Sequence, residues 1–324
     1  MRYFLGVDVG SSKTHALLAN ENGQAVAFGT AGAGNWQTVG YDGLKAALHQ
    51  AVDAACAMAD IQKDAIAGAG FGVAGYDFPS TDRQPHLETL STLGLVCPVN
   101  VVNDGINGLL AGTSSGVGVS LAAGSGVNCC GRGPNSEEGR IVGNGINFGE
   151  FGGGSEIVWK GLHQVNYAWI QRIPPTALTQ IYLDAVGASD IIDLMEGLSN
   201  ERYHLYPAIA IKIFEVAKNG DSVALDVVRW ASEELAWLAI SVARQIGMQD
   251  KEVEIVLSGS IFKAGDILTK PMQAHILEHV PQAQFTHLSA PPVVGATLLG
   301  MEIGNFNGYP VRDELIRTTQ EIYS

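Results

Sequence analysis

Short polar turns interrupt the apolar pattern at the start of the chain and divide it into three predicted strands. The apolar stretches cover residues 3–9 and 14–19, and a third run ends at Phe28. Gly10-Ser11-Ser12-Lys13 separates the first two stretches, and Asn20-Glu21-Asn22-Gly23 separates the second from the third. Turn-forming residues between β-rich runs at this spacing are typical of a three-stranded meander.

The same pattern returns in the second half of the chain. Strands are predicted for residues 116–122 and 127–130, with Ala123-Gly124-Ser125-Gly126 as the turn between them. A further turn, Gly133-Pro134-Asn135-Ser136, leads into a short strand at 140–142. We interpret this repetition as an internal duplication, with two unrelated α/β domains as the alternative.

After each meander, the pattern changes to alternating helices and strands. The apolar spacing predicts a helix over 41–59 and a helical insertion over 155–246, whose clearest helix covers 221–246. The strands predicted after the meanders are 67–73, 99–102, 253–257 and 283–286. This order predicts an α/β fold with two mixed sheets and flanking helices, divided into domains of residues 1–114 and 115–324.

Charge and hydropathy exclude several classes of partner. The net charge is −14, and no basic stripe is present to neutralise nucleic-acid phosphates or an anionic membrane surface. A phosphorylated substrate would therefore be held by backbone amides and a metal ion. No apolar run approaches the ~18 residues of a membrane span, and the first ten residues do not resemble a secretory signal, so we expect a cytoplasmic protein. The four cysteines lack metal-site spacing, which indicates free thiols.

Three glycine-rich turns follow predicted strands and could bind a nucleotide. Candidate phosphate-binding residues are Gly10, Ser11, Ser12, Lys13 and Thr14 in the first turn and Gly124, Ser125 and Gly126 in the second. Ser258, Gly259 and Ser260 form a third turn, which could let an adenosine approach the backbone. Asp8, at the end of the first strand, could hold Mg²⁺ through water; taken alone, the motif is better interpreted as an ordinary hairpin with a capping aspartate.

In their order along the chain, these segments resemble the phosphate and adenosine motifs of the superfamily that contains actin, the heat-shock ATPases and the sugar kinases. Residues 101–105 and 295–300 resemble its two connecting motifs. Closest in character is the branch that joins N-acetylglucosamine kinases with the activator ATPases of 2-hydroxyacyl-CoA dehydratases. The resemblance covers nearly the whole chain, and it implies two duplicated ribonuclease H-like domains around an interdomain cleft, with ATP and Mg²⁺ bound.

The resemblance also implies roles for individual residues. Asp104 matches the catalytic base, and the sugar-binding positions match Asn35, Trp36, Gly75, Asn103, Asp104, Asn128 and Glu150. The stretch Gly149-Glu150-Phe151-Gly152-Gly153 departs from the Gly-Asp-Glu-Gly-Ser of the kinases, which puts the identity of the sugar in doubt. The implied reaction is transfer of the γ-phosphate of ATP to the 6-hydroxyl of N-acetylglucosamine or a related amino sugar by a homodimer.

Phosphoryl transfer depends mostly on positioning and charge stabilisation, with a base that accepts the hydroxyl proton. Asp104 lies between a predicted strand and a predicted helix. We expect the helix N-terminus to lower the pKa of Asp104 and keep it ionised. The alternative role for Asp104 is that of a helix N-cap.

Two further motifs are set aside. Residues 70–75 fit the GxGxxG spelling of dinucleotide-binding proteins, but Tyr76-Asp77-Phe78-Pro79 follows where a helix should begin. His275-Ile276-Leu277-Glu278-His279 fits the HxxEH spelling of a zinc peptidase, and we interpret it as a solvated helix face.

Two other functions compete with the kinase. One is an ATPase that activates a dehydratase and holds an iron–sulfur cluster between subunits through cysteines. Cys129 and Cys130 are adjacent on a predicted strand, where their side chains would point to opposite faces. The other is a filament-forming or regulatory protein without catalysis, for which the chain carries no added polymerising or DNA-reading segment.

Overall fold

The chain forms two compact units, described here from a computed structural model that covers residues 1–323. Among the described residues, the first unit contains 1–120, 130–137 and 286–323, and the second contains 121–129 and 138–285. The predicted boundary near residue 114 assigned the C-terminal segment to the second domain. In the structure, this segment belongs to the first unit, because helix α10 (Pro292–Ile303) packs against strands of the first sheet.

The sheet of the first unit confirms the predicted meander. Its order is β3-β2-β1-β4-β5, in which β1 pairs antiparallel with β2 and parallel with β4. The strands are β1 (Tyr3–Val9), β2 (Thr14–Asn20), β3 (Ala25–Ala31), β4 (Ile66–Val73) and β5 (Val99–Asn103). Each lies within a few residues of the stretch predicted from the apolar pattern.

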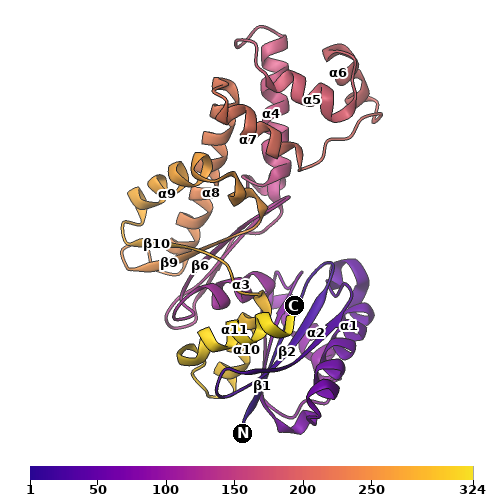
Figure 1. The fold of residues 1–324 in the computed structure, drawn as a ribbon, viewed down its shortest axis with the longest axis vertical. Helices are drawn as coiled ribbons and strands as arrows, with labels where there is room; N and C mark the ends of the chain where they lie inside the picture. The colour runs from indigo at the N-terminus through magenta and orange to yellow at the C-terminus, as the bar shows by residue number, and fades with distance from the viewer. Residues whose placement is uncertain (324) are drawn as a thin grey trace. The chain divides into compact units, whose positions relative to one another are not determined.

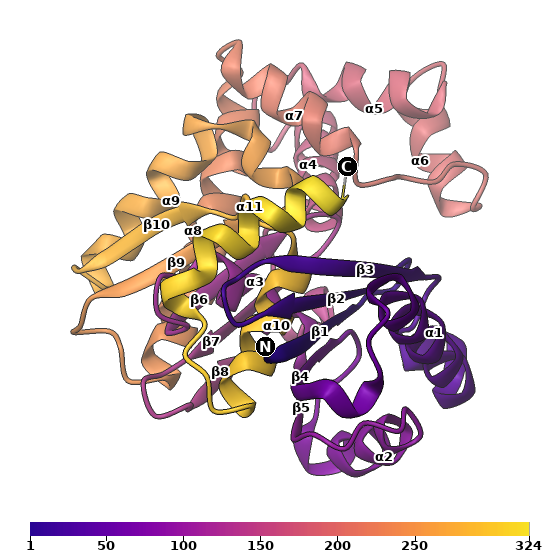
Figure 2. The ribbon, with the colours of Figure 1, turned by 60° about the horizontal axis from the view of Figure 1, so that its bottom comes forward.

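Helices cover both faces of this sheet, as Figure 2 shows. Alternate residues of β1 point to opposite faces: Leu5, Val7 and Val9 join a core with α1, while Phe4 packs toward α10. The helices of this unit are α1 (Trp36–Ala59), α2 (Pro79–Ser91), α3 (Asp104–Gly112), α10 and α11 (Arg312–Tyr323). The alternation places Asp8 on the same face as Phe4, next to α3.

Helix α10 packs closely against the sheet, and this close packing explains Gly70, the first glycine of the GxGxxG spelling at residues 70–75. A Cβ atom at Gly70 would lie 2.3 Å from the carbonyl oxygen of Ala296 on α10. Helix α2 begins only at Pro79, after a turn. Because Gly70 serves helix packing and no helix opens directly after the motif, the structure agrees with the rejection of the dinucleotide-binding reading.

The second sheet repeats the order of the first. Its order is β10-β9-β6-β7-β8, so β6, β7 and β8 take the positions of β1, β2 and β3. The strands are β6 (Gly118–Ala123), β7 (Val127–Arg132), β8 (Glu138–Arg140), β9 (Val253–Ser258) and β10 (Ala283–His287). The shared order supports an internal duplication over two unrelated domains.

The helical insertion of the second unit is also observed where it was predicted. Figure 1 shows its helices, which are α4 (Gly154–Trp169), α5 (Leu178–Val186), α6 (Ile191–Ser199), α7 (Ile209–Lys218) and α8 (Ser222–Gln245). Asp221 caps α8 by accepting a hydrogen bond from the Ala224 amide. Helix α9 (Asp266–His279) packs on α8. Within residues 1–323, no helix is long and apolar enough to cross a membrane.

Candidate active site

Two carboxylates of the first unit lie at neighbouring element ends. Asp8 is near the end of β1, and Asp104 is the first residue of α3. Desolvation raises the pKa of Asp8 to about 6, although a hydrogen bond from Asn107 opposes the shift. Desolvation, with the charges of Asp8 and Asp77, raises the pKa of Asp104 to about 7. Like charges in a poorly solvated site resist joint ionisation, so the pair favours a bound cation.

The expectation of a lowered pKa at Asp104 is therefore wrong. Hydrogen bonds from the first backbone amides of α3 do act in the expected direction, but desolvation and two neighbouring carboxylates outweigh them. The alternative role of Asp104 as an N-cap is also excluded, because Asn103 caps the helix by accepting a hydrogen bond from the Gly105 amide.

A chain of hydrogen bonds connects Asn103 with the first glycine-rich turn. Asn103 Nδ2 donates to Asp77 Oδ1 at 3.1 Å, and Gln37 Nε2 donates to Asp77 Oδ2 at 3.0 Å. Asn35 accepts from the Gln37 amide and donates to Ser11 Oγ at 3.1 Å. The structure thus brings the predicted residues Ser11, Asn35 and Asn103 into one polar network.

Gly75 and Trp36 complete this surface. Trp36 Nε1 donates to the Gly75 carbonyl at 2.7 Å. Gly75 has φ +85°, and a Cβ atom there would lie 2.7 Å from Asn35 Oδ1. A glycine is therefore required both by the backbone conformation and by the close contact with Asn35.

Two residues of this network were not predicted. Asp77 and Gln37 do not belong to any recognised sequence motif, and only their hydrogen bonds show that they are part of the site. Asp77 follows Gly75 by two residues, and the turn around Gly75 was the available signal. Asp82 fixes this turn, because its Oδ2 accepts from the amides of Asp77 and Phe78.

The predicted residues of the first phosphate turn differ in exposure. Ser11, Ser12 and Lys13 are exposed, and the Gly10 amide donates to the Lys13 carbonyl at 2.9 Å to close the turn. Thr14 is fully buried, and its hydroxyl donates to the Gly32 carbonyl at 2.9 Å. Thr14 therefore supports the loop that carries Asn35, and its hydroxyl is buried in that hydrogen bond.

In the second unit, the turn at Gly124, Ser125 and Gly126 lies against the N-terminus of α4. The Gly154 amide donates to the Gly124 carbonyl at 2.8 Å, and the Ser155 amide donates to the Ser125 carbonyl at 2.9 Å. A Cβ atom at Gly153 would lie 2.6 Å from the Gly126 Cα. Because the Gly154 and Ser155 amides are already donated to this turn, the part of it that could meet an anion is the exposed pair Ser125 and Gly126.

The third predicted turn lies beside the second. A Cβ atom at Gly259, which has φ +102°, would lie 2.2 Å from the Ala123 carbonyl oxygen. Gly124, Ser125 and Ser260 line one cavity of about 540 Å³, together with apolar residues of α7 and of the 260–264 turn. Its cationic groups are Lys218 and Lys263, which were not predicted. The size and apolar lining suit an adenosine.

Two sugar-binding candidates of the second unit have different surroundings. Asn128 is half-buried on β7. Glu150 is buried, and its two carboxylate oxygens accept hydrogen bonds from the amides of Val142 and Asn144, at 2.6 and 2.8 Å. Glu150 therefore fixes the conformation of the 142–150 loop. Each of its carboxylate oxygens can still accept a second hydrogen bond.

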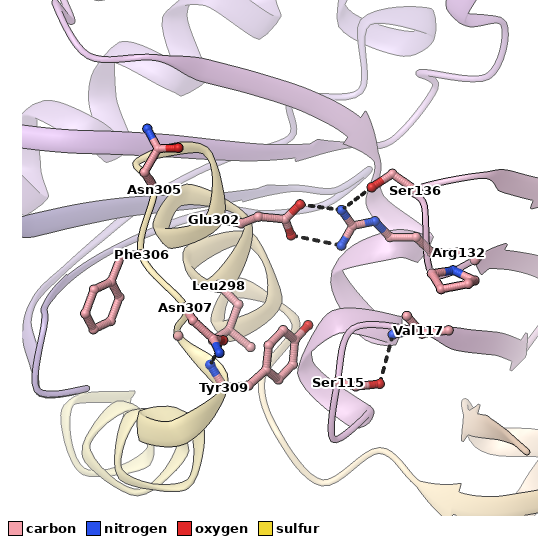
Figure 3. A pocket seen from close by; sticks show the side chains of 13 residues that line it. Ser115, Val117, Arg132, Ser136, Leu298, Glu302, Asn305, Phe306, Asn307 and Tyr309 are labelled. Carbon is pink, nitrogen blue, oxygen red and sulfur yellow. Dashed lines mark hydrogen bonds and ion pairs between the residues drawn. The ribbon is translucent and has the colours of Figure 1, made fainter.

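Another cavity, of about 410 Å³, lies in the first unit between the end of β7 and the loop after α10 (Figure 3). Its charged residues, Arg132 and Glu302, bind each other, with Arg132 Nη1 donating to Glu302 Oε2 at 2.9 Å. It contains none of the predicted site residues. Because its guanidinium is already neutralised, it offers no charge for a phosphate.

Comparison with known proteins identifies a family and two curated relatives. The model of the BadF/BadG/BcrA/BcrD ATPase family matches residues 5–300. The chain is 26% identical over 310 residues to the N-acetyl-D-glucosamine kinase of Dictyostelium discoideum, across 92% of this chain and 97% of the relative. It is 21% identical over 301 residues to the N-acetylmuramic acid/N-acetylglucosamine kinase of Clostridium acetobutylicum, across 92% and 98% of the two chains.

Solved structures share the fold. A candidate N-acetylglucosamine kinase from Chromobacterium violaceum matches with a TM-score of 0.65 at 24% identity, over 92% of this chain and 99% of the other. A glucokinase of the ROK family from Streptomyces griseus, solved with glucose and AMPPNP, matches with a TM-score of 0.52 at 18% identity, over 93% and 99%. The expected pair of ribonuclease H-like domains is confirmed.

Proposed function

Because the chain belongs to the BadF/BadG/BcrA/BcrD ATPase family, we propose that it is an ATP-dependent kinase of amino sugars. Its substrate is N-acetylglucosamine or a close relative, and the 6-hydroxyl is the acceptor. The N-acetylglucosamine kinase activities named for the relatives from Dictyostelium discoideum and Clostridium acetobutylicum support this substrate class.

The observation that carries the proposal is the state of Asp104. Its pKa, raised to about 7, is close to that of an efficient general base at neutral pH. Asn103 fixes its backbone at the start of α3, and the polar network of Asn35, Gln37 and Asp77 lies beside it. Asp104 accepts the proton of the sugar hydroxyl as that oxygen attacks the γ-phosphorus, and ADP leaves. Asn35, Asn103 and Asp77 present amide and carboxylate groups that suit sugar hydroxyls.

The three glycine-rich turns are assigned to the adenosine and the phosphates of ATP. Ser260, Lys263 and the apolar residues of α7 receive the adenosine, and the exposed turn residues Ser125 and Gly126 bind phosphate oxygens. In the first unit, the exposed turn Ser11–Lys13 offers amides, hydroxyls and one ammonium group, which suit phosphate oxygens. Lys218 and Lys263, which line the same cavity, add cationic groups to the backbone amides and Lys13 expected from the sequence.

The donor set around Asp8 suits Mg²⁺. Asp8 and Asp104 are desolvated carboxylates, and no cationic side chain contributes to either pKa. Hard oxygen ligands and retained water are what Mg²⁺ prefers. Asp8 would hold the ion through water, and the ion would neutralise charge on the phosphates. Asp8 itself keeps its orientation through the hydrogen bond from Asn107.

We also propose a homodimer in the cytoplasm. Large apolar side chains on the helical insertion are about half exposed, including Trp159, Trp169, Ile170 and Ile192. Exposed apolar residues of this size on one helical insertion suit a subunit interface. Light scattering after size exclusion measures the mass directly, and a monomer at micromolar concentration would contradict this part of the proposal.

The competing activator function finds less support. Cys129 and Cys130 are 0% and 4% exposed, and Cys130 belongs to a core cluster with Val102 and Ile106. A cluster shared between subunits needs thiolates at the surface. The purified protein is therefore expected to be colourless, and bound iron with visible absorbance would favour the activator.

The kinase is tested with Mg-ATP and a panel of sugars, with ADP release coupled to a spectrophotometric signal. N-acetylglucosamine, glucosamine, N-acetylmuramic acid and glucose form the core of the panel. We expect ADP release that depends on an amino sugar, and a product phosphorylated at position 6 by NMR. A regulatory protein without catalysis would give no sugar-dependent turnover, and that result would overturn the proposal.

A further inference from the structure

The last turn of α9 carries three potential metal ligands on one face. His275, Glu278 and His279 are spaced i, i+3 and i+4, and each offers a ligand atom within 4.8 Å of the other two. His275 Nδ1 lies 3.6 Å from Glu278 Oε2. This helix spacing brings two imidazoles and one carboxylate to the same point without any contribution from a loop.

Trp237 of α8 limits the movement of both imidazoles. Its ring centroid lies 5.1 Å from that of His275, nearly edge-on, and 4.8 Å from that of His279. The two imidazole centroids are 5.3 Å apart. An aromatic side chain against both rings reduces the rotamers that they can adopt, which lowers the entropy lost when they bind a ligand.

One imidazole nitrogen lacks a partner within the described chain. His275 Nε2 is buried and makes no hydrogen bond to residues 1–323. The nitrogen that faces Glu278 is Nδ1, so the unpartnered Nε2 shows that this ring is poorly solvated and does not itself mark the ligand position. The solvated helix face expected from the sequence therefore describes Glu278, whose side chain is 69% exposed, better than His275, at 24%.

We propose that His275, Glu278 and His279 bind one divalent first-row transition-metal ion, with Zn²⁺ as the best fit. Imidazole nitrogen and carboxylate oxygen are ordinary Zn²⁺ ligands, and water completes the tetrahedron. Bonds of about 2.0–2.1 Å require ligand atoms about 3.4 Å apart, so the side chains must close slightly. Glu278 is exposed and has the freedom to do so.

This site is separate from the proposed kinase site. None of its residues lines the nucleotide cavity, and Asp8 and Asp104 belong to the first unit. The proposal concerns binding alone and assigns no peptidase chemistry. A bound ion would tie the last turn of α9 together and raise the thermal stability of the second unit.

The test is a calorimetric titration of the metal-free full chain with ZnCl₂. Excess Mg²⁺ is present throughout, because Asp8 and Asp104 could also take up Zn²⁺. We expect one ion per chain and a rise in Tm. We expect His275→Gln and His279→Gln each to weaken Zn²⁺ binding by about tenfold or more. Removing a residue that only supports a metal ligand already costs about tenfold in affinity, and removing a ligand should cost at least as much.

The matched control is His204→Gln, at an exposed position outside the cluster. It is expected to leave Zn²⁺ affinity unchanged. Co²⁺ provides a second readout, because a tetrahedral nitrogen and oxygen site gives strong visible absorption that an octahedral carboxylate site does not. No uptake by the parent chain, or equal affinity in the His275→Gln/His279→Gln double variant, would overturn the proposal. Circular dichroism shows whether each variant is folded.

Discussion

Asn107 donates a hydrogen bond from Nδ2 to Asp8 Oδ1 at 2.7 Å, although the two residues are 99 positions apart. Asn107 is fully buried on α3, one turn after Asp104. It is the one group in the described chain whose hydrogen bond lowers the pKa of Asp8 against desolvation. The same helix therefore carries the proposed base and the residue that orients the proposed metal ligand.

The first prediction concerns this bond. Asn107→Leu keeps most of the side-chain volume but removes the donor, so the pKa of Asp8 rises above about 6. We expect a higher KM for Mg²⁺ at pH 6.5 and a smaller difference from the parent at pH 8.5, where Asp8 is ionised in both proteins. Asn135→Leu, at an exposed turn, is the control. Equal Mg²⁺ dependence at both pH values would argue against an orienting role.

The second prediction tests the base. Asp104→Asn keeps the shape of the side chain and is expected to lower kcat by about 10²–10⁴, the usual contribution of a general base. In the parent protein, kcat/KM should rise with pH up to about 7 and then level off, because only the ionised carboxylate accepts the proton. A rate that falls less than threefold in the variant would remove Asp104 from the reaction.

The third prediction concerns stability without Mg²⁺. The pKa of Asp104 is raised from 3.8 to about 7 on folding, so the folded state retains a proton that the unfolded state loses. The contribution of protonated Asp104 to the free energy of unfolding is complete below pH 3.8 and is lost as the pH rises through about 7. Asp104→Asn should therefore have a higher Tm than the parent at pH 8, with the gain shrinking toward pH 4. Thermal unfolding across this pH range measures the trend, and a variant destabilised at pH 8 would contradict it.

The apolar pattern was enough to predict nearly every strand. β1 runs from Tyr3 to Val9 in both prediction and structure, because a mostly apolar run, buried on both faces of the sheet, continues until Gly10 ends it. The division into units was harder. Residues 288–323 follow the second sheet in sequence, and the contacts of α10 with β1, β4 and α3, and of α11 with β3, assign them to the first unit.

Site residues could be predicted from the sequence where the backbone conformation favours one residue type, as positive φ favours glycine. Gly75 and Gly259 adopt positive φ, and their glycines marked turns that the sequence could indicate. Asp77 and Gln37 could not be found in this way, since their importance comes from hydrogen bonds across elements. The sign of the Asp104 pKa shift was missed for a similar reason: desolvation, its largest cause, and the charges of Asp8 and Asp77, which are distant in sequence, act only in the fold.

The fourth prediction tests the nucleotide cavity. Ala208 lines it at an exposed position just before α7, so Ala208→Trp would place an indole in the space proposed for adenosine. We expect KM for ATP to rise at least tenfold while KM for the sugar changes little. Ala54→Trp, on the exposed face of α1, is the matched control. Unchanged ATP dependence in Ala208→Trp would place the adenosine elsewhere.

The fifth prediction compares two glycines that share a backbone conformation but not a neighbourhood. Gly75 has φ +85° and Gly94 has φ +71°, so alanine at either position should lose about 1–2 kcal/mol for the left-handed backbone. At Gly94, nothing lies within 4 Å of the added Cβ atom, whereas at Gly75 the Cβ atom meets Asn35 Oδ1 at 2.7 Å.

The added contact displaces Asn35, which links Ser11 with Gln37. Gly75→Ala should therefore raise KM for the sugar and unfold more easily than Gly94→Ala, which should lose stability alone. Chemical denaturation and steady-state kinetics of both variants separate the two effects. If both alanines cost the same stability and neither alters KM, the Asn35–Gly75 contact has no part in sugar binding, and the acceptor surface must be sought among the other residues near Asp104.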